Sequence, residues 1–171
     1  MKCFNAHSGY LRNRIFSNSY AKFSDDYIGS LKLSFRHINT FDTNEDVKLS
    51  DRIFSSRKTL RGFESRGVGP KDGNIYVGGN YGAAASIQST FPNPFPDSWN
   101  AKTLVFLDNG NVWGVDYDST IDDSNKIRSS TGIVIDFRSP IGPMSFVFAQ
   151  DLSKADTDKT ESFNFRLGTT F

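Results

Sequence analysis

Few residues in this chain have the types and spacing that could support chemistry, and the densest group of them is acidic. Asp116, Asp118, Asp122 and Asp123 lie within eight positions of one another. Carboxylates are ligands that calcium prefers, but this spacing does not follow the pattern of an EF-hand loop. The acidic group is therefore interpreted as a solvated loop rather than as a metal site.

The sequence offers no other set of catalytic or ligand residues. Cys3 is the single cysteine, which excludes an internal disulfide and any metal site made of several cysteines. His7 and His37 are far apart in the sequence and lack ligand spacing. No nucleophile–base pair, phosphate-binding loop or supported carboxylate pair is present. We therefore expect neither an enzyme nor a cofactor.

Charge and composition narrow the class of protein further. The 171 residues include 20 Lys and Arg against 19 Asp and Glu, a balance that argues against a nucleic-acid partner. No apolar run approaches the roughly 18 residues of a transmembrane helix. The chain is rich in aromatic residues and glycine, with 16 Phe, 6 Tyr, 2 Trp and 14 Gly, which favours strands and turns. A transmembrane β-barrel fits this composition, because only half of each barrel strand is apolar.

Apolar and polar residues alternate with a period of two, which is typical of strands with two different faces. The apolar positions of the four clearest segments are Leu31, Leu33 and Phe35; Ile133, Ile135 and Phe137; Met144, Phe146 and Phe148; and Phe163, Phe165, Leu167 and Phe171. We predict seven strands in all, over residues 10–23, 27–37, 75–91, 102–113, 126–138, 144–151 and 161–171.

The connections between these strands are of two kinds. Those after the first, third and fifth strands are short, and those after the second, fourth and sixth are long and polar. An up-and-down barrel in an outer membrane sorts its connections in this way, with short turns on one side and long loops on the other. The alternatives are a soluble β domain, whose apolar face would be a core, and a passive channel.

Four motifs in order resemble one family. Residues 60–63 read Leu-Arg-Gly-Phe, residues 92–95 Pro-Asn-Pro-Phe, residues 106–113 Phe-Leu-Asp-Asn-Gly-Asn-Val-Trp, and residues 139–143 Ser-Pro-Ile-Gly-Pro. They resemble the C-terminal barrel region of the BamA-like outer-membrane assembly factors, also called the bacterial surface antigen family. The resemblance runs over nearly the whole chain.

The resemblance implies an all-β fold, an antiparallel up-and-down meander that forms the last seven strands of a sixteen-stranded transmembrane β-barrel. Residues 1–171 would be the C-terminal part of that barrel, with the POTRA domains and the N-terminal strands lying outside this chain. The implied location is the bacterial outer membrane. The implied function is to fold and insert outer-membrane proteins through a lateral seam. A two-partner-secretion or translocation pore of the same superfamily is the alternative.

The resemblance also implies partners and site residues. The partners would be outer-membrane lipid, unfolded outer-membrane protein clients and, in the full-length protein, accessory assembly lipoproteins. Arg61 would lie on a loop folded into the barrel lumen and would pair there with Asp108. A second acidic position of the family falls on Gln88, which would replace an ion pair by a hydrogen bond. Gly62 would permit a tight turn, and Phe63 would anchor the loop tip against the apolar wall.

The final strand is the second candidate site. Phe163, Phe165, Leu167 and the terminal Phe171 form an apolar stripe that resembles the signal by which outer-membrane barrels are recognised. Recognition by strand addition needs a free backbone edge for affinity and alternate side chains for specificity. The same stripe would face lipid in a folded barrel.

Overall fold

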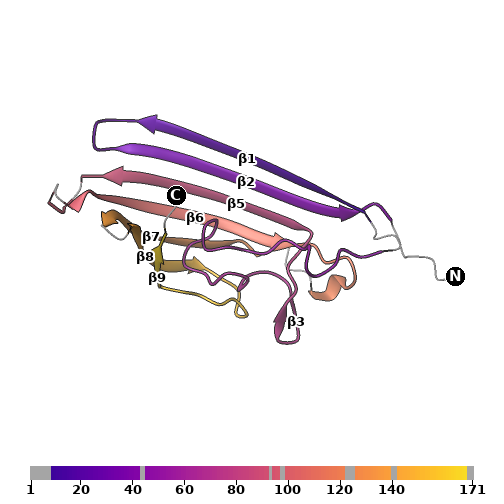
Figure 1. Cartoon of the computed structure of the whole chain (residues 1–171). Coiled ribbons are helices and arrows are strands. Elements are labelled where there is room, and N and C mark those ends of the chain that lie inside the picture. Colours follow the sequence, from indigo (N-terminus) through magenta and orange to yellow (C-terminus); the bar gives the residue numbers. More distant parts are fainter. Residues whose placement is uncertain are drawn as a thin grey trace.

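The computed structural model describes residues 9–42, 45–92, 94–96, 99–121, 126–139 and 142–168. One seven-stranded antiparallel sheet dominates it (Figure 1). Its strands, in spatial order, are β1 (Tyr10–Lys22), β2 (Ile28–Thr40), β5 (Tyr81–Phe91), β6 (Ala101–Trp113), β7 (Arg128–Ser139), β8 (Gly142–Ser153) and β9 (Phe163–Leu167). Each wall strand pairs with the next one along the chain, so the predicted antiparallel up-and-down meander is confirmed.

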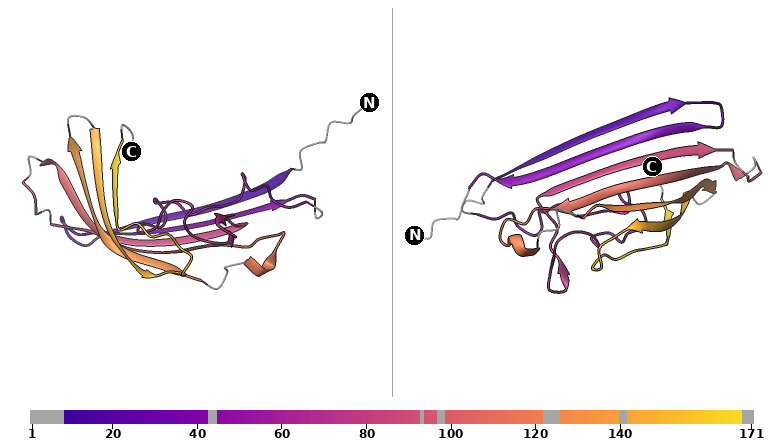
Figure 2. Two further views of the ribbon diagram at one scale, coloured as in Figure 1. Left: turned by 90° about the horizontal axis from the view of Figure 1, so that it is seen from below. Right: turned by 180° about the vertical axis from the view of Figure 1, so that it is seen from behind.

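The sheet is a curved wall rather than a closed barrel. Strands β7, β8 and β9 turn away from the plane of β1 to β6, which gives the sheet a concave and a convex face (Figure 2). The edges are β1 and β9. No helix in the described part of the chain is both long and apolar enough to cross a membrane.

The period of two sorts the side chains between the faces. Register places Leu31 opposite Ile87 and Ile133 opposite Phe148, and all four side chains are exposed on the convex face. Phenylalanine rings contact one another across β7, β8 and β9 on this face: Phe137 and Phe146 stack at a centroid distance of 5.4 Å, and Phe146 and Phe165 lie tilted to each other at 4.9 Å. A solvent-facing apolar surface of this kind suits contact with lipid.

Most strand boundaries lie within three residues of the prediction, and two strands differ more clearly. The strand predicted over residues 75–91 begins only at Tyr81, because Ile75–Tyr76 (β4) pairs with Lys71–Asp72 (β3) in a separate small hairpin. Gly78, at φ +68°, ends the apolar run between the two. The last strand begins at Phe163 rather than at residue 161, since Glu161 bonds to another part of the chain, and it runs to Leu167. Residues 169–171 of the predicted strand lie outside the described residues.

A long connection between β2 and β5, residues 41–80, covers part of the concave face and carries the β3–β4 hairpin (Figure 1). We call residues 55–68 of this connection the arginine loop. Buried apolar side chains gather beneath and within the connection. They form three clusters: Leu104, Phe106, Val134, Val147 and Ala149 on the wall; Ile38, Val47, Ile53 and Val112 at the long-loop end; and Leu60, Phe63 and Val68 within the arginine loop.

Candidate functional site

The tip of the arginine loop rests directly on the wall. Gly62 has a φ of +84°, which residues with a Cβ rarely adopt. A Cβ at this position would lie 3.1 Å from the Cβ of Ser130 and 3.2 Å from that of Ala149, on β7 and β8. The Ser130 hydroxyl donates to the carbonyl of Arg61. The glycine therefore permits both the turn and the close approach.

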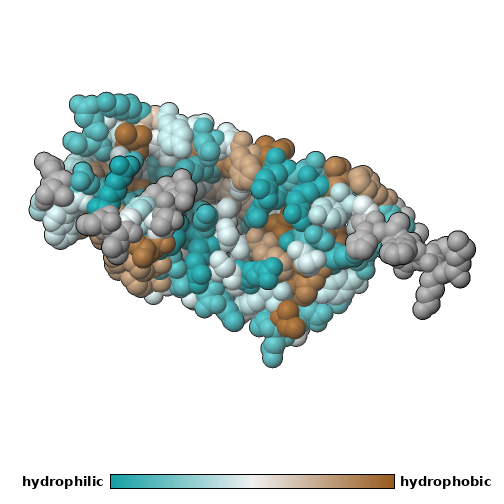
Figure 3. Space-filling model, viewed as in Figure 1, coloured by the Kyte–Doolittle hydropathy of each residue, from teal (hydrophilic) through white to brown (hydrophobic). Residues whose placement is uncertain are grey.

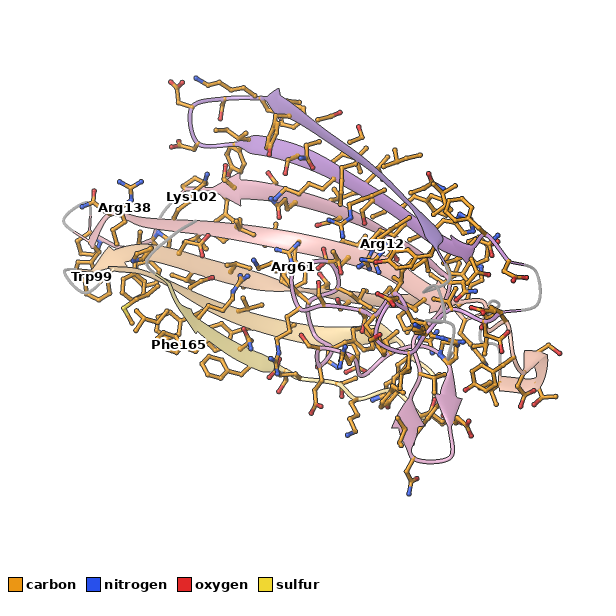
Figure 4. All side chains as sticks on the ribbon, turned by 45° about the vertical axis from the view of Figure 1, so that its right-hand side comes forward. Arg12, Arg61, Trp99, Lys102, Arg138 and Phe165 are labelled. Atoms are coloured by element: carbon orange, nitrogen blue, oxygen red, sulfur yellow. The ribbon has the colours of Figure 1, made fainter. Side chains whose placement is uncertain are left out.

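Arg61 reaches from this tip to β6, as Figure 4 shows. Its Nε donates to Oδ2 of Asp108 at 2.7 Å and its Nη2 to Oδ1 at 2.7 Å, a two-pronged ion pair. The backbone N–H of Arg61 also donates to Asp108 Oδ2, at 3.0 Å. The side chains of Arg61 and Asp108 are 11% and 1% exposed. The carboxylate is thus removed from water and depends on Arg61 for its counter-charge.

Three more side chains complete the surroundings of the guanidinium. Gln88 accepts from Nη1 at 3.3 Å, and the Ser86 hydroxyl accepts from Nη2 at 2.8 Å. The guanidinium carbon lies 3.7 Å from the centre of the Phe106 ring, a cation–π contact. The structure thus brings Arg61, Asp108 and Gln88 together, in the arrangement that the resemblance implies.

Sequence reasoning missed two members of this site, Ser86 and Phe106. Both follow from the strand register, which pairs Ser86 with Asp108 and Gln88 with Phe106 across β5 and β6. Alternation along one strand shows which residues share a face, whereas only the register shows which ones are neighbours across strands.

Phe63 lies in the apolar cluster of the arginine loop, which is separate from the buried cluster on the wall. Its side chain is buried with Leu60 and Val68 of the same loop, and its backbone forms an isolated β-bridge with Thr160. Phe63 therefore holds the arginine loop together and joins it to the segment that precedes β9.

Two further arginines form ion pairs that the sequence did not indicate. Arg128, at the start of β7, bonds Asp158 through Nε at 2.8 Å and Nη2 at 2.9 Å, and both side chains are 0% exposed. Arg52 bonds Asp116, and its guanidinium also lies 4.8 Å from the centre of the Tyr117 ring. Neither pair lies within a recognisable motif, since each joins segments that are distant in the sequence.

Asp116 has a specific structural environment. Burial alone would raise the pKa of its carboxyl group. Hydrogen bonds from the Val47 backbone N–H and the Asn80 amide, together with the charge of Arg52, outweigh burial and lower that pKa. Asp116 is therefore a structural anion that fixes the start of the β2–β5 connection.

The acidic loop provides no metal site in the part that the structure describes. No group of three or more His, Cys, Asp or Glu side chains suited to a metal occurs among the described residues. Asp118 accepts two hydrogen bonds from Thr120, one from the hydroxyl and one from the backbone N–H. Both lower the pKa of the Asp118 carboxyl group, and the bond from the hydroxyl has the larger effect. Asp122 and Asp123 lie outside the described residues.

The terminal strand presents its apolar stripe outward. Phe163, Phe165 and Leu167 are exposed on the convex face, and Figure 4 shows Phe165 pointing away from the sheet. Asn164 and Arg166 lie on the concave face, where Arg166 donates to the Ser145 hydroxyl at 3.3 Å. Phe171 lies outside the described residues.

The concave face carries charged side chains beside the apolar cluster of the wall. A cavity of about 570 Å³ lies beside Arg61, and its lining includes Lys32, Lys58, Lys102 and Asp136. Hydrophilic side chains gather around the hollow in the view of Figure 3. Charged side chains on the inner face and an apolar outer face match the design of outer-membrane barrels.

A family model described as the Omp85 superfamily domain matches residues 4–171. The chain belongs to the Omp85 superfamily. The motifs in this Omp85 chain are therefore family motifs and not chance matches in a soluble β domain.

The Omp85 chain is similar to proteins named "Outer membrane protein assembly factor BamA". It is 33% identical over 140 residues to the one from Neisseria meningitidis serogroup B, covering 66% of this chain and 18% of that protein. It is 28% identical over 150 residues to the one from Neorickettsia risticii, covering 85% and 20%. The chain therefore spans about a fifth of the length of these curated relatives.

A solved structure shows the same fold. The crystal structure of BamA from Haemophilus ducreyi lacking POTRA domains 1–3 superposes with a TM-score of 0.86 at 26% identity. The match covers 96% of this chain and 36% of that one. The curved wall is thus similar to part of a larger known barrel, and family membership places the chain in an outer-membrane protein.

Proposed function

We propose that this chain is the C-terminal wall of an outer-membrane protein assembly factor, which folds and inserts other outer-membrane proteins. Both curated relatives carry that name. The observation that carries the proposal is the arginine loop, which Arg61 holds against Asp108 on the concave wall.

The proposed mechanism relies on backbone pairing and is not enzymatic. Strand β9 is the edge of the described sheet and is five residues long, whereas the other wall strands have 11 to 13. A client strand would add to a seam at this edge, where main-chain hydrogen bonds give affinity in a region without water. Unfolded outer-membrane proteins are the proposed clients.

Lipid and accessory proteins are the other proposed partners. The exposed apolar side chains of the convex face would contact outer-membrane lipid, and accessory lipoproteins would act on the full-length protein. The arginine loop would keep the lumenal side of the wall fixed while the seam changes partners. Loss of its main ion pair should therefore impair assembly without removing any client-binding edge.

The test uses the full-length protein that contains this segment, reconstituted in liposomes with an unfolded barrel protein as client. Arg61→Gln should slow client insertion by about tenfold or more, because it leaves Asp108 buried without a counter-charge. Lys58→Gln is the matched control, since Lys58 lies on the same loop and no ion pair joins it to a described residue.

The proposal fails if Arg61→Gln inserts clients at the rate of Lys58→Gln while both proteins remain folded. Release of the client across the membrane, rather than insertion into it, would identify the secretion or translocation pore instead.

A further inference from the structure

The segment that leads into β9 is paired with the arginine loop. We call residues 158–162 the strand root. The backbone N–H of Glu64 donates to the carbonyl of Lys159 at 3.0 Å, and the N–H of Lys159 donates to the carbonyl of Gly67 at 2.9 Å. The N–H of Glu161 donates to the carbonyl of Gly62, also at 2.9 Å. The strand root and the loop thus form one small backbone-paired unit.

One ion pair joins the same two segments through side chains. Arg57 Nε donates to Oε2 of Glu161 at 2.6 Å, and Nη2 donates to Oε1 at 3.0 Å. The hydrogen bond with Glu161 is the largest influence on the pKa of Arg57, which is raised. Asn164, within β9, donates to Oε2 of Glu161 at 3.2 Å. Glu161 therefore contacts both the arginine loop and the terminal strand.

The two ends of the strand root differ in their exposure to water. At one end Asp158 pairs with Arg128, with both side chains fully buried. At the other end the side chains of Arg57 and Glu161 are 43% and 24% exposed. A buried pair is costly to separate, whereas an exposed pair is weak and is screened by salt. The side-chain attachment of the strand root is thus buried at Asp158 and open to water at Glu161, where one backbone hydrogen bond to Gly62 accompanies it.

We propose that Arg57 and Glu161 are positioning residues, which couple the arginine loop to the root of the terminal strand and release it when the seam opens. This inference rests on the proposed function and adds to it a contact that controls the release of the terminal strand. Because the two-pronged geometry sets the direction of the chain at Glu161, the pair determines how β9 leaves the loop. Because the pair is exposed, its release needs no unfolding of the wall.

Hydrogen exchange in the full-length protein, held in lipid nanodiscs, tests the coupling without any client. Arg57→Gln and Glu161→Gln should each raise exchange several-fold in peptides that cover residues 158–167, and the charge-reversed pair Arg57→Glu with Glu161→Arg should restore protection. Raising salt from about 0.05 M to about 0.5 M should increase exchange in the unmodified protein and have little further effect in the single variants. Lys58→Gln should match the unmodified protein.

The coupling is overturned if the single variants exchange like Lys58→Gln, or if the charge-reversed pair exchanges as fast as the single variants. Client insertion then separates this inference from the proposed function. If exchange responds as expected while neither these variants nor Arg61→Gln alters insertion, the coupling stands and the proposed function fails. If Arg61→Gln slows insertion while exchange at residues 158–167 is unchanged, the function stands and the coupling fails.

Discussion

The arginine loop has two attachments that use the same chemistry in different surroundings. On the wall side, Arg61 forms an ion pair with Asp108 beneath the loop, and the Phe106 ring lies against the guanidinium. On the strand side, Arg57 forms an ion pair with Glu161 in the same two-pronged geometry, but both side chains are partly exposed to water. The two pairs therefore differ in burial far more than in hydrogen bonding.

That difference decides what each attachment can do. Breaking a buried pair leaves a stranded charge and costs about 3–5 kcal/mol, whereas an exposed pair contributes about 0–1 kcal/mol. The wall attachment is suited to permanent support, and the strand attachment to exchange during function. The contribution of a loop arginine to stability can thus be judged only once the burial of its ion-pair partner is known.

The largest effect on stability is expected at the Arg128–Asp158 ion pair, whose side chains are both fully buried. Asp158→Asn removes the buried carboxylate that accepts two hydrogen bonds from Arg128, so the unfolding free energy of the full-length protein should fall by about 3–5 kcal/mol. Urea unfolding followed by tryptophan fluorescence measures this change. Glu161→Gln, on the same segment but exposed, is the control and should cost less than about 1 kcal/mol. Equal losses would refute the distinction by burial.

A smaller effect is expected from the backbone at the loop tip. Gly62→Ala places a methyl group against Ser130 and Ala149 and forces alanine to a positive φ. The conformational penalty alone is about 1–2 kcal/mol, so the unfolding free energy should fall by at least this amount. Gly73→Ala is the matched control, because Gly73 also has a positive φ but has open space around it. If both variants lose the same stability, the close approach at Gly62 adds nothing to the wall attachment.

The smallest effect is expected from acid at Asp116, which is only partly buried. Its pKa is lowered in the folded protein, so its contribution to stability is complete above the unfolded value of about 3.9 and is lost as the pH falls through the lower folded value. The unfolding free energy should therefore decline below about pH 4, and less so in Asp116→Asn. Asp25→Asn, in an exposed turn, should leave the decline unchanged. A decline that is identical in Asp116→Asn would show that other groups cause it.

Much of the wall could be predicted from the sequence because strands carry a strong two-residue period. Leu31, Leu33 and Phe35 indicated a strand with one apolar face, and the sorted loop lengths indicated the meander. The strand boundary at Tyr81 could not be predicted, because Ile75 and Tyr76 continue the apolar pattern of the strand. The chain nevertheless turns at Gly78, which has a positive φ. Local patterns do not show where a hairpin ends.

The site was predictable only in part. Family motifs pointed to Arg61, Asp108 and Gln88, but no local pattern links Arg57 with Glu161 or Arg128 with Asp158. The partners in each of these pairs are brought together by the folding of a long connection over the wall. Such contacts depend on three-dimensional packing, which a single sequence does not display.

The central claim is that the ion pair between Arg61 and Asp108 fastens the arginine loop to the wall. A double-mutant cycle tests it most directly, with Arg61→Gln, Asp108→Asn and both changes in the full-length protein, each measured by urea unfolding. We expect a coupling free energy of about 1–3 kcal/mol, because each single change strands a partner that the double change removes. Additivity within about 0.5 kcal/mol would contradict the claim and would reduce Arg61 to an ordinary loop charge.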